Sequence, residues 1–173
     1  MKPIRYCCFA LCAVMLLQSD VRLAQTKEVL APPGDSVVSI SGDVEHPLKL
    51  TQADFAKLPR KAVRAKDHGG KESEFEGVML VDVLSLAGVK FGDQLRGPNL
   101  AKYLIVEAAD GYKAVFALPE LDPAFTDRMV ILANKRDGKP LAETEGPYRI
   151  VITDEKRQGR WVRQVVALLI RRG

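Results

Sequence analysis

Short segments in which hydrophobic and polar residues alternate run along most of this chain. The alternation over residues 38–40 and the return of hydrophobic residues at 48–50 predict two strands joined by a turn. Asp110-Gly111 and Asp137-Gly138 favour tight hairpin turns later in the chain. Further alternating or continuously apolar stretches predict strands at 61–66, 102–107, 112–117, 130–133, 148–152 and 165–170. The domain is therefore predicted to be rich in strand.

Two short helices are predicted between these strands. Thr51 followed by Asp54 is a variant of the capping box, and the helix that it opens must end before Pro59. The hydrophobic residues of segment 80–87 repeat at helical spacing, and Gly88 suits the C-terminal end of that helix. The pattern indicates the α+β class, with a mixed sheet and short helices in one domain.

The first 24 residues have a different pattern. A basic start at Lys2 and Arg5 precedes an unbroken apolar run from 7 to 17, a layout typical of a secretory signal peptide. The run is shorter than the roughly 20 residues that cross a bilayer. We therefore expect a signal peptide at 1–24, a proline-bearing linker at 25–34, and a periplasmic or secreted domain at 35–173 without a stable membrane span. Arg22 lies where a small residue is preferred for cleavage, so a retained membrane tether stays open as the alternative.

Cysteine and charge distribution exclude several classes of function. Cys7, Cys8 and Cys12 all lie in the predicted leader, so its removal would leave neither a disulfide nor a thiolate metal ligand. The formal net charge is +4, but basic residues alternate with acidic ones, and aromatic residues are not interleaved with Lys and Arg. We expect no nucleic-acid partner. A Gly-x-Ser-x-Gly nucleophile motif does not occur in the sequence, which leaves hydrolase chemistry without support.

An ordered set of short motifs covers almost the whole predicted domain. The motifs are Leu50-Thr51 through Leu58-Pro59, Glu76-Gly77-Val78 through Ala87-Gly88, Ala109-Asp110-Gly111-Tyr112, Asp137-Gly138-Lys139-Pro140-Leu141, Gly146-Pro147-Tyr148-Arg149-Ile150-Val151 and Arg160-Trp161-Val162. In this order and spacing the set resembles the molybdopterin-binding domain of the sulfite oxidase family, and in particular its short, exported, single-domain relatives. The resemblance implies a mixed, β-sheet-rich sulfite oxidase-like molybdopterin-binding fold with short helices, and a molybdopterin cofactor.

The resemblance also implies a cysteine that binds molybdenum after the second strand-like segment. The equivalent stretch here, residues 63–70, contains none. Soft sulfur is the ligand that such a centre uses, so we predict no metal-ligating residue and leave the redox role open. His68, beside Asp67, has two interpretations. It is a base or metal ligand in the vacated site, or a solvated loop histidine beside a turn aspartate.

Three arginines are candidates for holding an anion. By resemblance, Arg149, Arg160 and Arg163 hold the phosphate and pterin of the cofactor, and a guanidinium grips phosphate through two parallel hydrogen bonds. The alternative is that Arg157, Arg160 and Arg163 form an ordinary solvated charge run that pairs with Asp154 and Glu155. Both interpretations remain open on the sequence.

Two aromatic residues complete the candidates. Tyr112 either packs across its hairpin or faces the cofactor pocket, and Trp161 is expected in the core. The predicted cofactor-binding residues are His68, Tyr112, Arg149, Arg160 and Arg163. The sequence thus predicts an exported molybdopterin-dependent oxidoreductase, or its redox-inactive remnant without the metal-ligating cysteine. The alternative is a cofactor-free extracytoplasmic module that binds a small anionic ligand or a partner protein.

Overall fold

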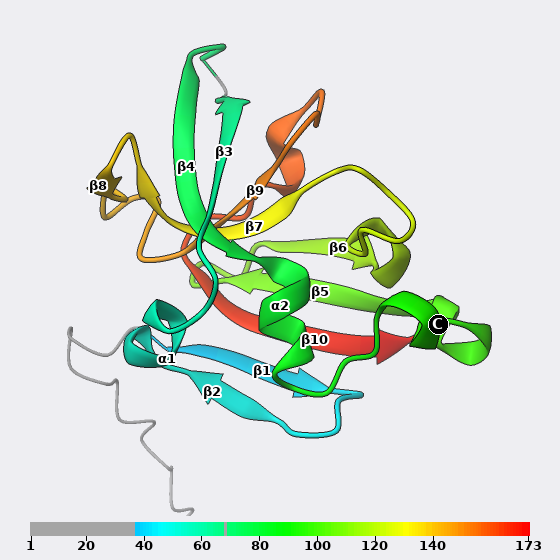
Figure 1. The fold of residues 1–173 in the computed structure, drawn as a ribbon. Coiled ribbons are helices and arrows are strands. Elements are labelled where there is room, and N and C mark those ends of the chain that lie inside the picture. The colour runs from blue at the N-terminus through cyan, green and yellow to red at the C-terminus, as the bar shows by residue number, and fades with distance from the viewer. Residues whose placement is uncertain (1–36, 68) are drawn as a thin grey trace, which may run out of the picture. The chain divides into compact units, whose positions relative to one another are not determined.

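The computed structural model describes residues 37–67 and 69–173, which contain ten strands (Figure 1). The strands are β1 (Val38–Gly42), β2 (Leu48–Leu50), β3 (Lys61–Lys66), β4 (Glu72–Met79), β5 (Lys102–Ala108), β6 (Lys113–Ala117), β7 (Val130–Arg136), β8 (Lys139–Pro140), β9 (Arg149–Ile152) and β10 (Val165–Arg172). They form two sheets. The first has the order β2-β1-β10-β5-β6, and the second has the order β3-β4-β7-β8, with β9 also pairing with β7.

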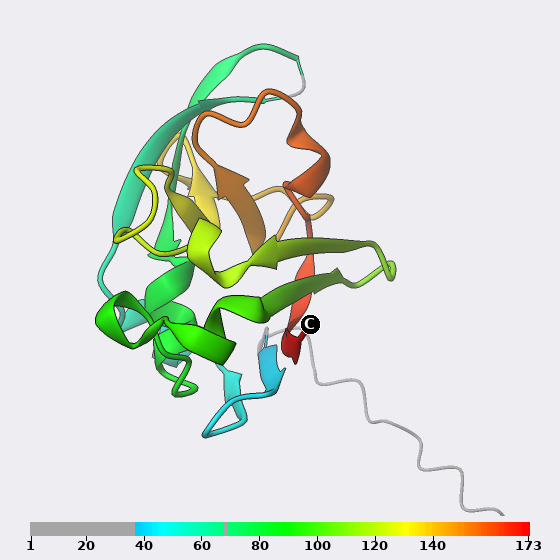
Figure 2. The ribbon, with the colours of Figure 1, turned by 90° about the vertical axis from the view of Figure 1, so that its right-hand side faces the viewer.

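The first sheet is mixed. Strand β1 is parallel to β10, with Ile40 opposite Leu168, whereas the other neighbours in this sheet are antiparallel. The parallel pair joins the first described strand to the last one. In the strand order β10 has two strands on each side, so it lies at the centre of the sheet. The segment from η4 (Gln158–Arg160), a 3-10 helix, leads directly into β10 and passes beside the β5–β6 hairpin (Figure 2), where the Ala109 backbone N–H donates to the Gln164 carbonyl oxygen.

Helices in the described residues are short. They are α1 (Gln52–Ala56), α2 (Leu80–Ser85) and the 3-10 helices η1 (Gly92–Gln94), η2 (Gly97–Ala101), η3 (Leu118–Glu120) and η4. The Thr51 hydroxyl accepts a hydrogen bond from the Asp54 backbone N–H at 3.2 Å, as the capping pattern predicts. Gly88 follows α2 with a φ of +81°, a left-handed conformation that favours glycine at a helix end.

Apolar side chains from both sheets and from α2 form one core. Phe75, Leu84 and Ile150 are fully buried in it. Strand β4 approaches β7 closely at Gly77, because a Cβ atom there would lie 2.2 Å from the Leu132 carbonyl oxygen. A side chain at position 77 would therefore push the two strands apart, which explains glycine in the Glu76-Gly77-Val78 motif.

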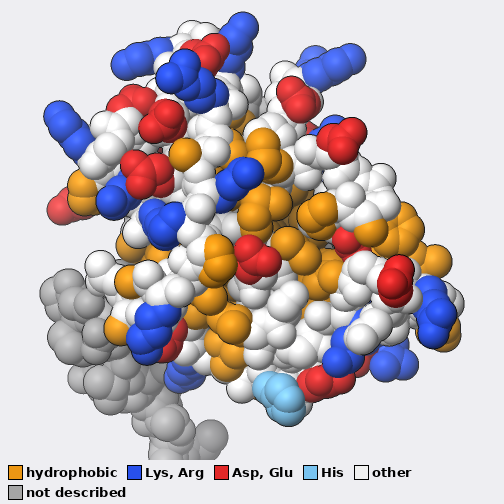
Figure 3. Space-filling model, viewed as in Figure 1, with side chains coloured by type: hydrophobic (Ala, Val, Ile, Leu, Met, Phe, Trp, Pro, Cys, Tyr) orange, Lys and Arg blue, Asp and Glu red, His pale blue; other side chains and the backbone are white. Residues whose placement is uncertain are grey.

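The architecture confirms the predicted α+β class and its mixed, strand-rich sheets. The strand predicted at 61–66 has the observed bounds of β3, and the two predicted hairpin turns join β5 to β6 and β7 to β8. The predicted leader, the linker and the three cysteines lie outside the described residues. Within the described part of the chain, no helix is long and apolar enough to cross a membrane. Basic and acidic side chains are interspersed on the face shown in Figure 3.

Candidate functional site

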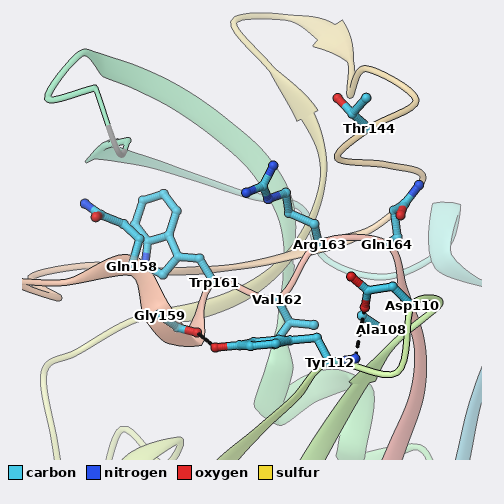
Figure 4. A pocket seen from close by; sticks show the side chains of 10 residues that line it. All are labelled: Ala108, Asp110, Tyr112, Thr144, Gln158, Gly159, Trp161, Val162, Arg163 and Gln164. Carbon is cyan, nitrogen blue, oxygen red and sulfur yellow. Dashed lines mark hydrogen bonds between the residues drawn. The ribbon is translucent and has the colours of Figure 1, made fainter.

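A cavity of about 440 Å³ lies where three connections from distant parts of the chain meet (Figure 4). These are the β5–β6 turn, the β8–β9 loop and the segment from η4 into β10. The lining residues are Ala108, Asp110, Tyr112, Thr144, Gln158, Gly159, Trp161, Val162, Arg163 and Gln164. The volume falls within the range of roughly 300–1,000 Å³ that is typical of small-molecule sites.

Hydrogen bonds tie the β5–β6 turn to the segment around η4. The Tyr112 hydroxyl donates to the Gly159 carbonyl oxygen at 2.6 Å, and the Ala109 backbone N–H donates to the Gln164 carbonyl oxygen at 2.9 Å. Inside the turn, the Asp110 carboxylate accepts from the Tyr112 backbone N–H at 2.9 Å. Tyr112 lines the cavity. That it faces a cofactor pocket stays a prediction.

Trp161 separates this cavity from a second one of about 270 Å³. The second cavity is also lined by Arg64, Ala65, Lys66, Glu72, Ile152, Asp154 and Glu155. It reaches the end of β3, the stretch where the resemblance places the metal-binding cysteine. The Gln158 side-chain amide donates to the Lys66 carbonyl oxygen at 2.9 Å and so links η4 to β3. Trp161 is 4% exposed, as expected for a core residue, yet it forms a wall of both cavities.

Arg149 lies behind Trp161 in the interior. Its guanidinium carbon is 5.4 Å from the ring centres of both Phe75 and Trp161, and its Nη1 is 2.9 Å from Glu145. The Arg149 side chain is 3% exposed. Burial lowers the pKa of Arg149, whereas the nearby Glu145 carboxylate raises it. The buried Nε of Arg149 and Nε1 of Trp161 have no hydrogen-bond partner among the described residues. The two orphaned donors lie on neighbouring side chains.

Arg160 and Arg163 differ in their surroundings although they are three residues apart. The Arg160 guanidinium contacts Glu120 at 2.8 Å and Glu155 at 2.9 Å, and it lies over the Phe116 ring at 4.9 Å. Arg160 lines neither of the two cavities. Arg163 is exposed on the cavity wall and has no carboxylate partner among the described residues. The structure thus brings Arg163 and Tyr112 to one cavity, with Arg149 behind it, and leaves Arg160 in a separate ion-pair cluster.

Asp67, the first residue of the predicted Asp67–His68 pair, has a structural role. His68 itself lies outside the described residues. The Asp67 carboxylate pairs with Arg136 and accepts hydrogen bonds from the backbone N–H groups of Gly69 at 2.9 Å and Lys71 at 3.1 Å. The bond from Arg136 is the main reason why the pKa of Asp67 is lowered. In residues 37–67 and 69–173, no three His, Cys, Asp or Glu side chains form a group able to hold a metal ion.

Four polar lining residues were not predicted from the sequence. Asp110 was interpreted only as a turn residue, and Thr144, Gln158 and Gln164 belong to no motif. Among the four, only Asp110 could have been found from the sequence, because it shares the motif Ala109-Asp110-Gly111-Tyr112 with the candidate Tyr112. Gln164 has a φ of +48°, which turns the chain from η4 into β10, but the sequence around it does not indicate this conformation.

Comparison with known proteins defines the class. The chain belongs to the family described as oxidoreductase molybdopterin binding domain, whose family model matches residues 28–170. Its structure is similar to the crystal structure of the sulfane dehydrogenase SoxCD from Paracoccus pantotrophus, with a TM-score of 0.64 and 25% identity. The match covers 81% of this chain and 39% of that chain, so this protein spans well under half of it. A search of curated proteins gave no match. The family predicted from the ordered motifs is confirmed.

The family implies a molybdopterin cofactor, and the described residues fit its parts unequally. Residues 13–173 contain no cysteine, so the walls of both cavities offer no thiolate for molybdenum. An organic anion fits better, because Arg163 lies on an open wall without a carboxylate partner among the described residues and Trp161 supplies an aromatic surface. The metal does not fit the described donor set, whereas an anionic ligand does.

Proposed function

We propose that this protein is an exported, redox-inactive member of the molybdopterin-binding domain family that binds a small anionic ligand in the cavity beside Arg163. The observation that carries the proposal is the position of Arg163, a cation without a carboxylate partner among the described residues, on the wall of a 440 Å³ cavity. Arg160, by contrast, contacts two carboxylates and takes no part in the proposed site.

The surroundings of Arg163 support anion binding. Hydrogen bonds from a guanidinium to an anion are charge-assisted and contribute about 1.5–3 kcal/mol each. Thr144 and Gln158 line the same cavity and supply neutral polar groups. Arg149 lies behind Trp161 and is near enough to Arg163 for their charges to interact, although Glu145 compensates part of its charge. The cavity therefore combines the cation Arg163 with neutral polar groups, and Asp110, on the β5–β6 turn, lines it as well.

The anion site is tested by titrating the purified protein with inorganic phosphate in a calorimeter. Arg163→Gln is expected to weaken phosphate binding about tenfold or more, because it removes the charge-assisted bonds. Arg96→Gln is the matched control, since Arg96 is exposed, lines no described cavity and has no carboxylate partner in the described part of the chain. Equal losses in both variants, or no loss in Arg163→Gln, would remove the basis of the proposal.

A second candidate is an active molybdopterin-dependent oxidoreductase, which the family match and the cavity at the end of β3 favour. Protein purified from a host that makes the molybdenum cofactor distinguishes the two. The redox-inactive proposal predicts far less than one molybdenum atom per chain by elemental analysis. Stoichiometric molybdenum with turnover of sulfite would establish the enzyme instead.

Export is supported by the basic, apolar and then polar order of residues 1–24. Secreted protein is expected to begin near Gln25 or Thr26, which an intact-mass measurement decides. The product would then contain no cysteine, and its melting temperature would not change with dithiothreitol. A product that retains Cys7, Cys8 and Cys12 would support the membrane tether.

A further inference from the structure

The cavity beside Arg163 also has an acidic wall. Asp110 is exposed on the β5–β6 turn and lines the cavity from a different segment than Arg163 (Figure 4). One carboxylate oxygen of Asp110 accepts from the Tyr112 backbone N–H, and the other has no donor among the residues that the structure describes. Asp110 and Arg163 do not pair with each other within 4.0 Å. The cavity thus presents two opposite charges that are both available to a ligand.

Opposite charges on two walls select for a ligand that carries both. A simple anion at Arg163 would gain one charge-assisted contact and would be repelled by Asp110. A molecule with a carboxylate and an ammonium group would gain a contact at each wall. The Tyr112 side chain runs from the β5–β6 turn to Gly159, where its hydroxyl donates a hydrogen bond (Figure 4). This bond ties the turn that bears Asp110 to the segment that bears Arg163.

We propose that the ligand is a small zwitterion of the amino-acid type, with its carboxylate at Arg163 and its ammonium group at Asp110. This inference rests on the proposed function, because it requires that Arg163 binds an anion. It adds the class of ligand and assigns a recognition role to Asp110, which is otherwise explained as a turn residue.

The test compares matched probes that differ in one charge. The purified protein is titrated with β-alanine, 4-aminobutyrate and 6-aminohexanoate, which vary the charge separation, and with butyrate and butylamine, which each lack one charge. The best amino acid is expected to bind at least about tenfold more tightly than butyrate and butylamine, because it gains a second charge-assisted contact.

Asp110→Asn isolates the acidic wall. Asparagine retains the oxygen that accepts from the Tyr112 N–H, and Asn-Gly favours the same hairpin turn. This variant is expected to lose most of the preference for the amino acid and to bind butyrate as well as the unmodified protein does, or better. Asp93→Asn is the control, because Asp93 is exposed and lines no described cavity. Asp110→Ser, which also keeps an acceptor, replaces Asp110→Asn if that variant has a lowered melting temperature.

The outcomes separate the inference from the proposed function. If butyrate and the amino acids bind equally and both depend on Arg163, the zwitterion is overturned and the anion site stands. If neither phosphate nor butyrate binding depends on Arg163, the proposed function itself fails. An unchanged preference for the amino acid in Asp110→Asn and Asp110→Ser would also overturn the role of Asp110.

Discussion

Arg149 and Glu145 form an ion pair in the interior, with Nη1 of Arg149 2.9 Å from the carboxylate. The Arg149 guanidinium lies over both the Phe75 and the Trp161 ring, which are themselves in edge-to-face contact, so its charge is fixed behind the Trp161 wall of the cavity. Removing one partner of a buried pair is costly because the other charge is left without compensation. The structure thus gives Arg149 a role in stability, and its contact with a ligand stays a prediction.

Replacing Arg149 tests this role. Arg149→Ala is expected to lower the free energy of unfolding by about 3–5 kcal/mol, the usual cost of breaking a buried pair. Arg136, which is 3.6 Å from Glu145, compensates the remaining carboxylate only in part. Urea denaturation measures the change, and Arg171→Ala, at an exposed position in β10, is the control. A loss below about 1 kcal/mol would show that the pair contributes little.

The pH dependence of stability is predicted from Asp43. Hydrogen bonds from Arg172 and then Lys102 lower the pKa of Asp43 from 3.8 to about 2. Because the folded pKa lies below the unfolded value, this group stabilises the fold above pH 3.8, and the contribution is lost as the pH falls through about 2. Asp43→Asn should therefore show a smaller decrease in the free energy of unfolding across that acid range. Denaturation curves at several pH values test this prediction. Asp93→Asn is the control, and its free energy of unfolding should change with pH as that of the unmodified protein does.

Elements and partners differ in how far the sequence predicts them. The strand β3 has its predicted bounds because alternation is a local property of the chain. The different surroundings of Arg160 and Arg163 cannot be predicted locally, because Arg160 pairs with Glu120, which lies forty residues before it in the chain. The role of Asp110 was missed for a related reason, since a turn aspartate lines a cavity only when another segment closes it. The ordered motifs predicted the family, whereas contacts between distant segments decide which charges remain free.

The hydrogen bond from Tyr112 to Gly159 predicts a small, local effect. Tyr112→Phe is expected to lower the free energy of unfolding by about 0.5–1.5 kcal/mol, because one hydrogen bond at a half-exposed side chain is lost. Hydrogen exchange of the backbone amides in η4 should become faster. Tyr103→Phe is the control, because its hydroxyl has no hydrogen-bond partner in the described part of the chain. Equal exchange in both variants would show that this bond does not hold the cavity wall.

The last prediction concerns the metal. The family resemblance places the missing thiolate within residues 63–70, where Lys66, Asp67 and His68 are the candidate positions. Lys66 lines the second cavity beside Trp161, and its link to Gln158 uses the carbonyl oxygen, so a cysteine side chain would not disturb that bond. Asp67 is a poorer choice, because its carboxylate pairs with Arg136 and holds the turn.

Lys66→Cys is therefore expected to retain more molybdenum than the unmodified protein when both are purified from a host that makes the cofactor. The reason is that a thiolate supplies the soft ligand that the described donor set lacks. Elemental analysis measures the metal, and Lys71→Cys is the matched control, because it places a thiol in the connection that follows β3, outside both cavities. Asp67→Cys should retain less metal than Lys66→Cys and should melt at a lower temperature. If Lys66→Cys folds normally and retains no more molybdenum than Lys71→Cys, the cavity beside Trp161 does not accept the cofactor, whatever ligand is supplied at this position.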